Sequence, residues 1–271
     1  MDLQRLSLIW RIPIVFTAIS IIWWISSGVN TWIGDEGEYS RTAHVLSALL
    51  IFSLVIPLII VARKYLDKQP WTGLRLTSFK KGWKPFVYGG ISYLIPALLG
   101  ITIFSLFGWT KVNFQASFGE LLFAVIVLLI LVFMFEALPE ELIFRGYFYR
   151  NLNNFLSKWK AVLAQSVLFV LFALIIGAAP SIDRIIFFIA IAIVIGMIRV
   201  ITDNVWSAVG YHLAFQTMQQ LFGHPYHQEL TSTTPALMEI VILGIIPFSF
   251  AIVTLKLFVK KEPDWKEVDP E

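Results

Sequence analysis

The sequence predicts an all-α, polytopic membrane protein that folds as a transmembrane helical bundle of about eight spans. Of its 271 residues, 58% are hydrophobic and 14% are charged, with a mean hydropathy of +0.76. A soluble domain of this length would carry about 25% charged residues. Apolar stretches of about 20 residues, long enough to cross a bilayer as a helix, recur along the chain. The absence of cysteine excludes disulfides, thiolate metal sites and a cysteine nucleophile.

The apolar stretches define the expected helices in chain order. They fall at roughly 8–29, 42–62, 86–108, 120–138, 160–179, 184–201, 205–222 and 236–258. The sixth and seventh are short and closely connected, so a bundle of seven helices is an alternative. The first is too long for the apolar part of a signal peptide and lacks a small-residue cleavage pattern, which favours a retained span.

The distribution of basic residues predicts the orientation. With the N-terminus inside, the cytoplasmic side receives all of the 21 lysines and arginines except Arg41, Lys111 and Arg184. This positive-inside bias predicts that the N- and C-termini are both cytoplasmic. Together with the retained first span, it favours an integral protein of a prokaryotic plasma membrane.

Three regions follow from this pattern. Residues 1–117 form an N-terminal three-span region with a basic cytoplasmic loop, 63–84, which is either an interfacial amphipathic helix or a plain basic loop. Residues 118–222 form a four-helix core. Residues 223–271 hold the last span and a charged cytoplasmic tail, and we expect its polar end, 262–271, to be solvated.

The most informative stretch closes the apolar run that starts near Leu121. It reads Glu140-Glu141-Leu-Ile-Phe-Arg145-Gly146, and ionisable residues in a membrane segment usually have a function. Glu141 and Arg145 are four residues apart with the acid first, which favours an ion pair on one helix face. Glu140 points about 100° away and has no local partner. Glu141 is therefore expected to be held by the ion pair, whereas Glu140 is free for chemistry. The alternative is that these charged residues are an interfacial cluster that only ends the span.

A second polar group lies in the seventh span. His212 and Gln216 share one helix face, and His212 lies roughly 12 Å inside the cytoplasmic boundary. Together with Glu140 they can form a site in the cytoplasmic half of the bilayer, where a carboxylate activates water and the other two side chains stabilise an oxyanion. The alternative is a histidine that bonds a neighbouring helix. Glu136, one turn before Glu140, either lines the same cavity or caps a polar seam.

Both motifs together resemble a known family. Glu140-Glu141-x-x-x-Arg145-Gly146, with the later Gly196…Trp206-Ser-Ala-Val-Gly-Tyr-His212-x-x-x-Gln216, resembles the CAAX-protease and bacteriocin-processing (CPBP, or Abi) family of intramembrane endopeptidases. The resemblance covers roughly residues 118–222 and makes them a CAAX-protease-like core. It implies that Glu140 activates water, that Glu141 and Arg145 brace the site, and that His212 belongs to the oxyanion side. A peptide or lipidated peptide is the implied substrate; membrane lipids are expected partners and nucleic acid is not.

The sequence departs from the family pattern at two positions. Where the family usually has Phe-x-x-x-His in the fifth span, this chain has Phe169 and then Ala173. Where the family has asparagine after the later histidine, it has Gln216. Loss of a proton-transfer partner typically costs about 10²–10⁴ in rate. A catalytically impaired member that acts as a membrane scaffold or bacteriocin-immunity protein is therefore the alternative function, and a proton-coupled transporter is a third.

We expect no cofactor. Catalytic zinc sites usually have three protein ligands and an open position. Zinc is a second possibility, with Glu140 and His212 as its first ligands and Glu141 as the third. The sequence leaves the substrate and the oligomeric state open.

Overall fold

The computed structural model describes residues 6–33, 39–222 and 229–271, and it is 78% helical. Within these ranges, seven helical segments are long and apolar enough to cross a membrane: Leu8–Ile33, Arg41–Asp67, Trp71–Leu106, Phe118–Asn153, Lys158–Ile175, Ile182–Thr202 and Leu237–Lys256. An eighth helix, Val205–Phe222, is more polar and is mostly buried among the others. The predicted all-α polytopic bundle is confirmed.

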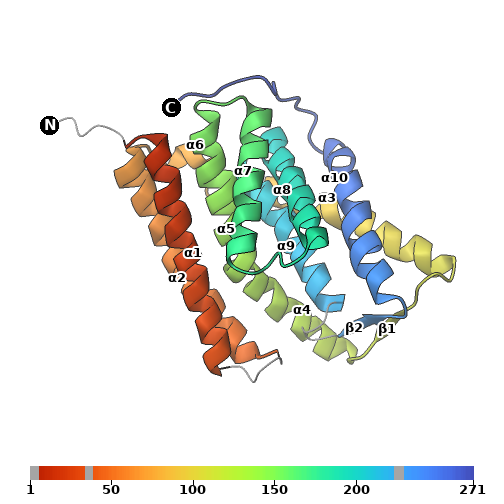
Figure 1. The fold of residues 1–271 in the computed structure, drawn as a ribbon. Coiled ribbons are helices and arrows are strands. Elements are labelled where there is room, and N and C mark those ends of the chain that lie inside the picture. The colour runs from red at the N-terminus through yellow and green to blue at the C-terminus, as the bar shows by residue number, and fades with distance from the viewer. Residues whose placement is uncertain (1–5, 34–38, 223–228) are drawn as a thin grey trace.

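The elements follow one another as helices with short connections (Figure 1). The α-helices are α1 (Leu8–Ile33), α2 (Arg41–Val61), α3 (Phe79–Leu106), α4 (Phe118–Val132), α5 (Leu138–Glu141), α6 (Tyr149–Asn153), α7 (Lys158–Ile175), α8 (Ile182–Thr202), α9 (Val205–Phe222) and α10 (Ile246–Lys256). Wider π-helical turns are η1 (Ala62–Asp67), η3 (Phe133–Ala137), η4 (Leu142–Phe148) and η5 (Leu237–Ile245), and η2 (Trp71–Leu74) is a 3₁₀ turn. Strands β1 (Val112–Phe114) and β2 (Leu230–Ser232) pair antiparallel, with Asn113 opposite Thr231.

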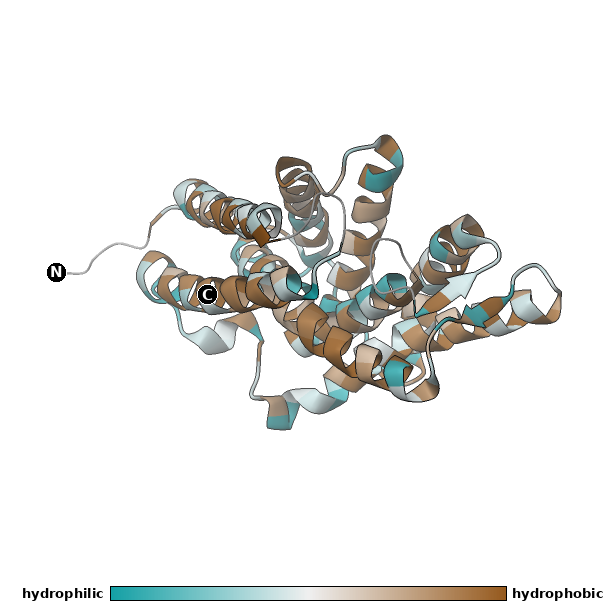
Figure 2. Cartoon of the chain, turned by 90° about the horizontal axis from the view of Figure 1, so that it is seen from below, coloured by the Kyte–Doolittle hydropathy of each residue, from teal (hydrophilic) through white to brown (hydrophobic). Residues whose placement is uncertain are grey.

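Hydrophobic residues predominate along the helices (Figure 2), and many of the large ones are exposed. Large side chains such as Trp32, Leu106 and Phe118 are more than 80% exposed. Exposed apolar surface on this scale marks contact with a membrane or a partner, and the span lengths favour the membrane. The chain is therefore an integral membrane protein.

The central helix α9 packs closely against α3 through glycines. A Cβ atom added at Gly210 would lie 2.0 Å from the carbonyl oxygen of Phe86, and one added at Gly89 would lie 1.9 Å from that of Ser207. Small residues of this kind let two helix backbones approach in a membrane, where packing replaces the hydrophobic driving force. The position of α9, which carries His212, therefore depends on Gly89 and Gly210.

We expect Gly210→Ala to destabilise the protein by about 1–3 kcal/mol, because the new methyl group meets backbone that cannot rotate away. The midpoint of thermal unfolding in detergent measures this loss. Gly119→Ala is the matched control, since nothing lies within 4 Å of a Cβ at that position. Equal midpoints for the two variants would contradict the close approach of α3 and α9.

The fourth span is longer than the sequence predicts. The apolar pattern predicts an end near residue 138, but the helical path continues from Phe118 to Asn153 through η3, α5, η4 and α6. Of the charged residues that suggest a boundary, Glu141 and Arg145 are buried inside the bundle, where His212 and the Ala192 carbonyl are among their partners. Glu140 and Glu141 therefore lie within this path and not at its end.

Only the middle of the basic segment 63–84, residues 68–78, is a connection between helices, and it contains the short turn η2. The first part of the segment, η1, continues α2 inward, and α3 begins at Phe79. Arg63 is buried and donates to Asp67 over 2.8 Å, and Arg11 of α1 donates to the other oxygen of Asp67 over 2.9 Å. Tyr147 adds a hydrogen bond of 3.0 Å to Asp67. This carboxylate joins three separate segments, which hydropathy alone does not reveal.

Most residues of the C-terminal tail, 262–271, are exposed, but hydrogen bonds and ion pairs hold the tail against the bundle. The tail lies across the end of the bundle where α1 begins (Figure 1). The amide of Lys158 donates to Glu267 over 3.0 Å, and the amide of Asp269 donates to Asn153 over 3.1 Å. Arg150 also donates to the Asp269 carboxylate over 2.6 Å. Acidic tail residues are held because buried arginines at this end need counter-charges.

Candidate active site

The acidic motif lies where the helix geometry changes. Glu136 belongs to η3, Glu140 and Glu141 to the short α5, and Arg145 to η4. Pro139, which has no amide hydrogen, stands directly before the two acids. Isolated π-helical turns occur frequently at functional sites, because they rotate side chains out of the regular pattern. In this chain they flank the pair of glutamates on both sides.

Glu141 is fully buried and is held by two partners. Arg145 Nη1 donates to Glu141 Oε1 over 3.0 Å, and His212 Nδ1 lies 2.8 Å from the same oxygen. The arginine is fixed in turn, since its Nη2 donates to the Ala192 carbonyl over 3.2 Å and its guanidinium lies 4.8 Å from the Phe169 ring centre. The ion pair expected from the i,i+4 spacing is present, and it compensates a charge that would otherwise be costly in the bundle.

Glu140 is the free carboxylate. Its side chain is partly exposed, and it makes no hydrogen bond or ion pair with any other residue of the described ranges. It lines a cavity of about 300 Å³ that is also lined by Glu136, His212 and Gln216. The predicted separation of one held and one free glutamate is therefore present in the geometry.

His212 reaches the acidic motif, but through the other glutamate. The sequence motifs predict a site that His212 shares with Glu140, whereas its hydrogen bond goes to Glu141. Its second ring nitrogen, Nε2, has no hydrogen-bond partner among the residues that the structure describes, and the ring lines the cavity. A carboxylate on Nδ1 fixes the orientation of an imidazole and leaves Nε2 to act. Gln216, one turn further along α9, lines the same cavity.

Glu136 also lines this cavity, which was one of two alternatives in the sequence analysis. Gln220 holds it, because Gln220 Nε2 donates to Glu136 Oε1 over 3.0 Å and both side chains are buried. Gln220 is not among the residues predicted from the sequence. Its signal was the repeated four-residue spacing: Glu136 and Glu140 share one helix face, and Gln216 and Gln220 share another.

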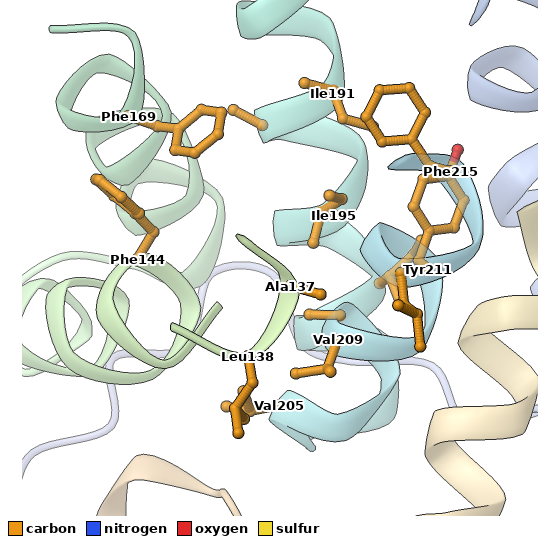
Figure 3. Close-up of a cluster of buried hydrophobic side chains, with 14 of the residues drawn as sticks. Ala137, Leu138, Phe144, Phe169, Ile191, Ile195, Val205, Val209, Tyr211 and Phe215 are labelled. Atoms are coloured by element: carbon orange, nitrogen blue, oxygen red, sulfur yellow. The ribbon is translucent and has the colours of Figure 1, made fainter. Parts of the chain in front are cut away.

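Ala173 lines the cavity as well, at the position where the family usually has a second histidine. Aromatic side chains from several helices line the cavity, among them Phe169 and Phe215, which belong to a buried hydrophobic cluster (Figure 3). The rings of Phe144 and Phe169 meet edge to face with centroids 4.9 Å apart, and Phe215 of α9 stands on the other side. The polar groups therefore lie in an apolar enclosure, where their electrostatic interactions are stronger than in water.

The donor set does not fit a three-ligand metal site. Within the described ranges, no group of three histidine, aspartate or glutamate side chains is arranged to hold a metal ion. Glu141 is already neutralised by Arg145, and a guanidinium at 3.0 Å disfavours a second cation on that carboxylate. The expectation of no cofactor stays a prediction.

The comparison with known families matches the region of this site. Residues 120–218 match the family described as "Rce1-like: Type II CAAX prenyl endopeptidase Rce1-like". Searches of the curated proteins and of the solved structures gave no match. The matched segment begins in α4 and ends in α9, so it contains Glu140, Glu141, Arg145, His212 and Gln216. Over residues 120–218 the chain is therefore similar to the CAAX-protease and bacteriocin-processing family of membrane endopeptidases.

Proposed function

We propose that the chain is an intramembrane endopeptidase in which Glu140 activates the attacking water. The observation that carries the proposal is the Glu140 carboxylate, free of partners among the described residues, on the wall of a cavity that His212 shares. Glu140 takes a proton from water while the water oxygen bonds to the peptide carbonyl carbon. The same proton then goes to the nitrogen of the leaving amine as the carbon–nitrogen bond breaks.

The other site residues stabilise charge and position. The carbonyl oxygen becomes an oxyanion during the attack, and His212 Nε2 and the Gln216 amide are its proposed donors. A donating Nε2 requires a proton on both ring nitrogens, and the Glu141 carboxylate at 2.8 Å stabilises that cation. Arg145 keeps Glu141 in place, because it bonds both that carboxylate and α8. His212, Gln216, Glu141 and Arg145 thus stabilise charge or hold position, and Glu140 is the only general base in this proposal.

The cavity suits a peptide or lipidated peptide. Phe169, Phe172 and Phe187 line it together with other aromatic residues, and apolar side chains or a lipid chain pack well against such walls. We propose further that both termini face the cytoplasm of a prokaryotic cell, from the basic-residue bias, and that membrane lipids are the other partners while nucleic acid is not.

One observation favours a second function. Ala173 leaves the site with a single imidazole, so a catalytically impaired member that serves as a membrane scaffold or bacteriocin-immunity protein is the alternative. Gln216 is weaker support for this alternative, because glutamine keeps the amide group of the family's asparagine and adds one methylene. The two functions differ in whether purified wild-type protein cuts any peptide.

We expect wild-type protein to cleave members of a peptide library and Ala173→His to cleave them faster, by up to about 10²-fold, because the imidazole enters the cavity and can share the proton transfer. Initial rates in nanodiscs measure both. Leu174→His is the matched control, because Leu174 is the next residue along the chain and its side chain is 43% exposed on the outside of α7. If only Ala173→His cleaves peptides, the wild-type chain is a catalytically impaired member, and the proposed peptidase function of the wild type is contradicted.

A further inference from the structure

The cavity next to Glu140 has a definite direction. Apart from the acids, α9 and one aromatic residue each of α1 (Trp23) and η3 (Phe135), it is lined by residues towards the end of α7, by Ala178 of the connection that follows, and by α8 from Arg184 to Ile195. This connection lies away from the end of the bundle where α1 begins and where the C-terminal tail lies (Figure 1). Among the described residues, neither the tail nor the segment between η1 and α3 contributes to its lining.

The exposure of the lining residues follows the same direction. Arg184, near the start of α8, is exposed, and Ala178 is partly exposed. Deeper along α8, Ile191 and Ile195 are buried. Ala192, whose carbonyl bonds Arg145, lies eight residues beyond Arg184, which is roughly 12 Å of helix. The cavity therefore leads from Arg184 down to the level of the Glu141–Arg145 pair.

The two ends of this cavity have opposite charge. Arg184 stacks on Phe187 and Phe188, with its guanidinium 5.2 and 5.3 Å from their ring centres, and it has no ion-pair partner in the described part of the chain. Glu136 and Glu140 lie at the inner end. An anionic group is attracted to the first position and repelled from the second, and low-dielectric walls strengthen both effects.

We propose that substrate reaches Glu140 from the end of the bundle opposite both termini, and that Arg184 binds a carboxylate of the peptide at the mouth of the cavity. Arg184 is then a specificity-determining residue, and the peptide lies with its carboxylate outermost and its apolar part against the aromatic walls. The identification of the bound peptide as a substrate rests on the proposed peptidase function. The direction of access and the selection for negative charge rest on the cavity alone.

The experiment uses the natural absence of cysteine. In Ala173→Cys, a single thiol lines the cavity, and its labelling rate is measured in proteoliposomes with membrane-impermeant methanethiosulfonates, one a sulfonate and one a quaternary ammonium. Lys260→Cys and Lys111→Cys mark the two ends of the bundle. Ala161→Cys, on the same helix, fully buried and not part of the lining, is the control for unspecific reaction.

We expect Ala173→Cys to react from the Lys111 side and not from the Lys260 side. Arg184→Gln should lower the ratio of sulfonate to ammonium labelling by roughly three- to ten-fold, since loss of one cation acts on the two reagents in opposite directions. Labelling from the Lys260 side, no labelling from either side, or an unchanged ratio would overturn the proposal. If Ala173→Cys does not fold, Ala178→Cys serves in its place.

Protection of the thiol tests the ligand without requiring cleavage. An acetylated Phe-Leu-Val tripeptide with a free C-terminal carboxylate is compared with its amide, and with an amide that carries one glutamate. We expect the free acid to slow labelling at least three-fold more than the plain amide, and Arg184→Gln to remove the difference. Protection by the glutamate peptide as well extends the site to side-chain carboxylates; equal protection by acid and plain amide would overturn the carboxylate assignment. Absence of peptidase activity would leave these labelling results unaffected.

Discussion

Glu140→Gln is expected to lower the kcat of peptide cleavage by about 10²–10⁴-fold relative to wild type, while the protein stays folded. The amide cannot take a proton from water, so the attack loses its general base. The fold tolerates the change because the carboxylate has no hydrogen bond or ion pair to lose within the described chain, and the two side chains have nearly the same shape. Initial rates on cleaved peptides, with the unfolding midpoint measured in parallel, check both parts.

Glu239→Gln is the matched control for this experiment. Glu239 is also a partly exposed glutamate on a membrane-spanning segment, at the start of η5, but it does not line the cavity. We expect its cleavage rate to stay within two-fold of wild type, because surface substitutions away from a site usually cost little. Full activity of Glu140→Gln would remove Glu140 from the chemistry and leave His212 as the base.

Local spacing made part of the site predictable. The Glu141–Arg145 pair and the absence of a partner for Glu140 on its own helix both follow from helical spacing. The spans were predictable for a related reason, since a bilayer requires about 20 apolar residues wherever a helix crosses it. Each of these inferences needs one stretch of sequence and no knowledge of its neighbours.

Contacts between distant segments were not predictable. His212 and Gln216 could be placed near the acidic motif only as a group, and the choice of Glu141 as the partner depends on how α9 docks. The docking of α9 depends on the close contacts of Gly89 and Gly210 with the backbone of the opposite helix. These contacts can be recognised only when the positions of both helices are known. The ordered tail was missed for the same reason: Asp269 resembles any solvated acid until Arg150 stands beside it.

Glu141→Gln is expected to lower the free energy of unfolding by about 3–5 kcal/mol, the largest loss of stability that we predict for this site. The glutamine keeps the volume and one acceptor oxygen. It removes the negative charge, so Arg145 stays buried at 0% exposure as an uncompensated cation. Unfolding midpoints in detergent, with denaturant used to obtain free energies, measure this loss.

A double-mutant cycle separates charge from packing. Arg145→Met alone leaves the Glu141 charge buried with His212 as its remaining partner, whereas Glu141→Gln together with Arg145→Met removes both charges. We therefore expect the double variant to lose clearly less stability than the sum of the two single variants, because a buried pair is costly mainly when it is half removed. Strict additivity would mean that the two side chains do not interact. In that case Arg145 could not be what holds Glu141, and through it His212, at the cavity wall.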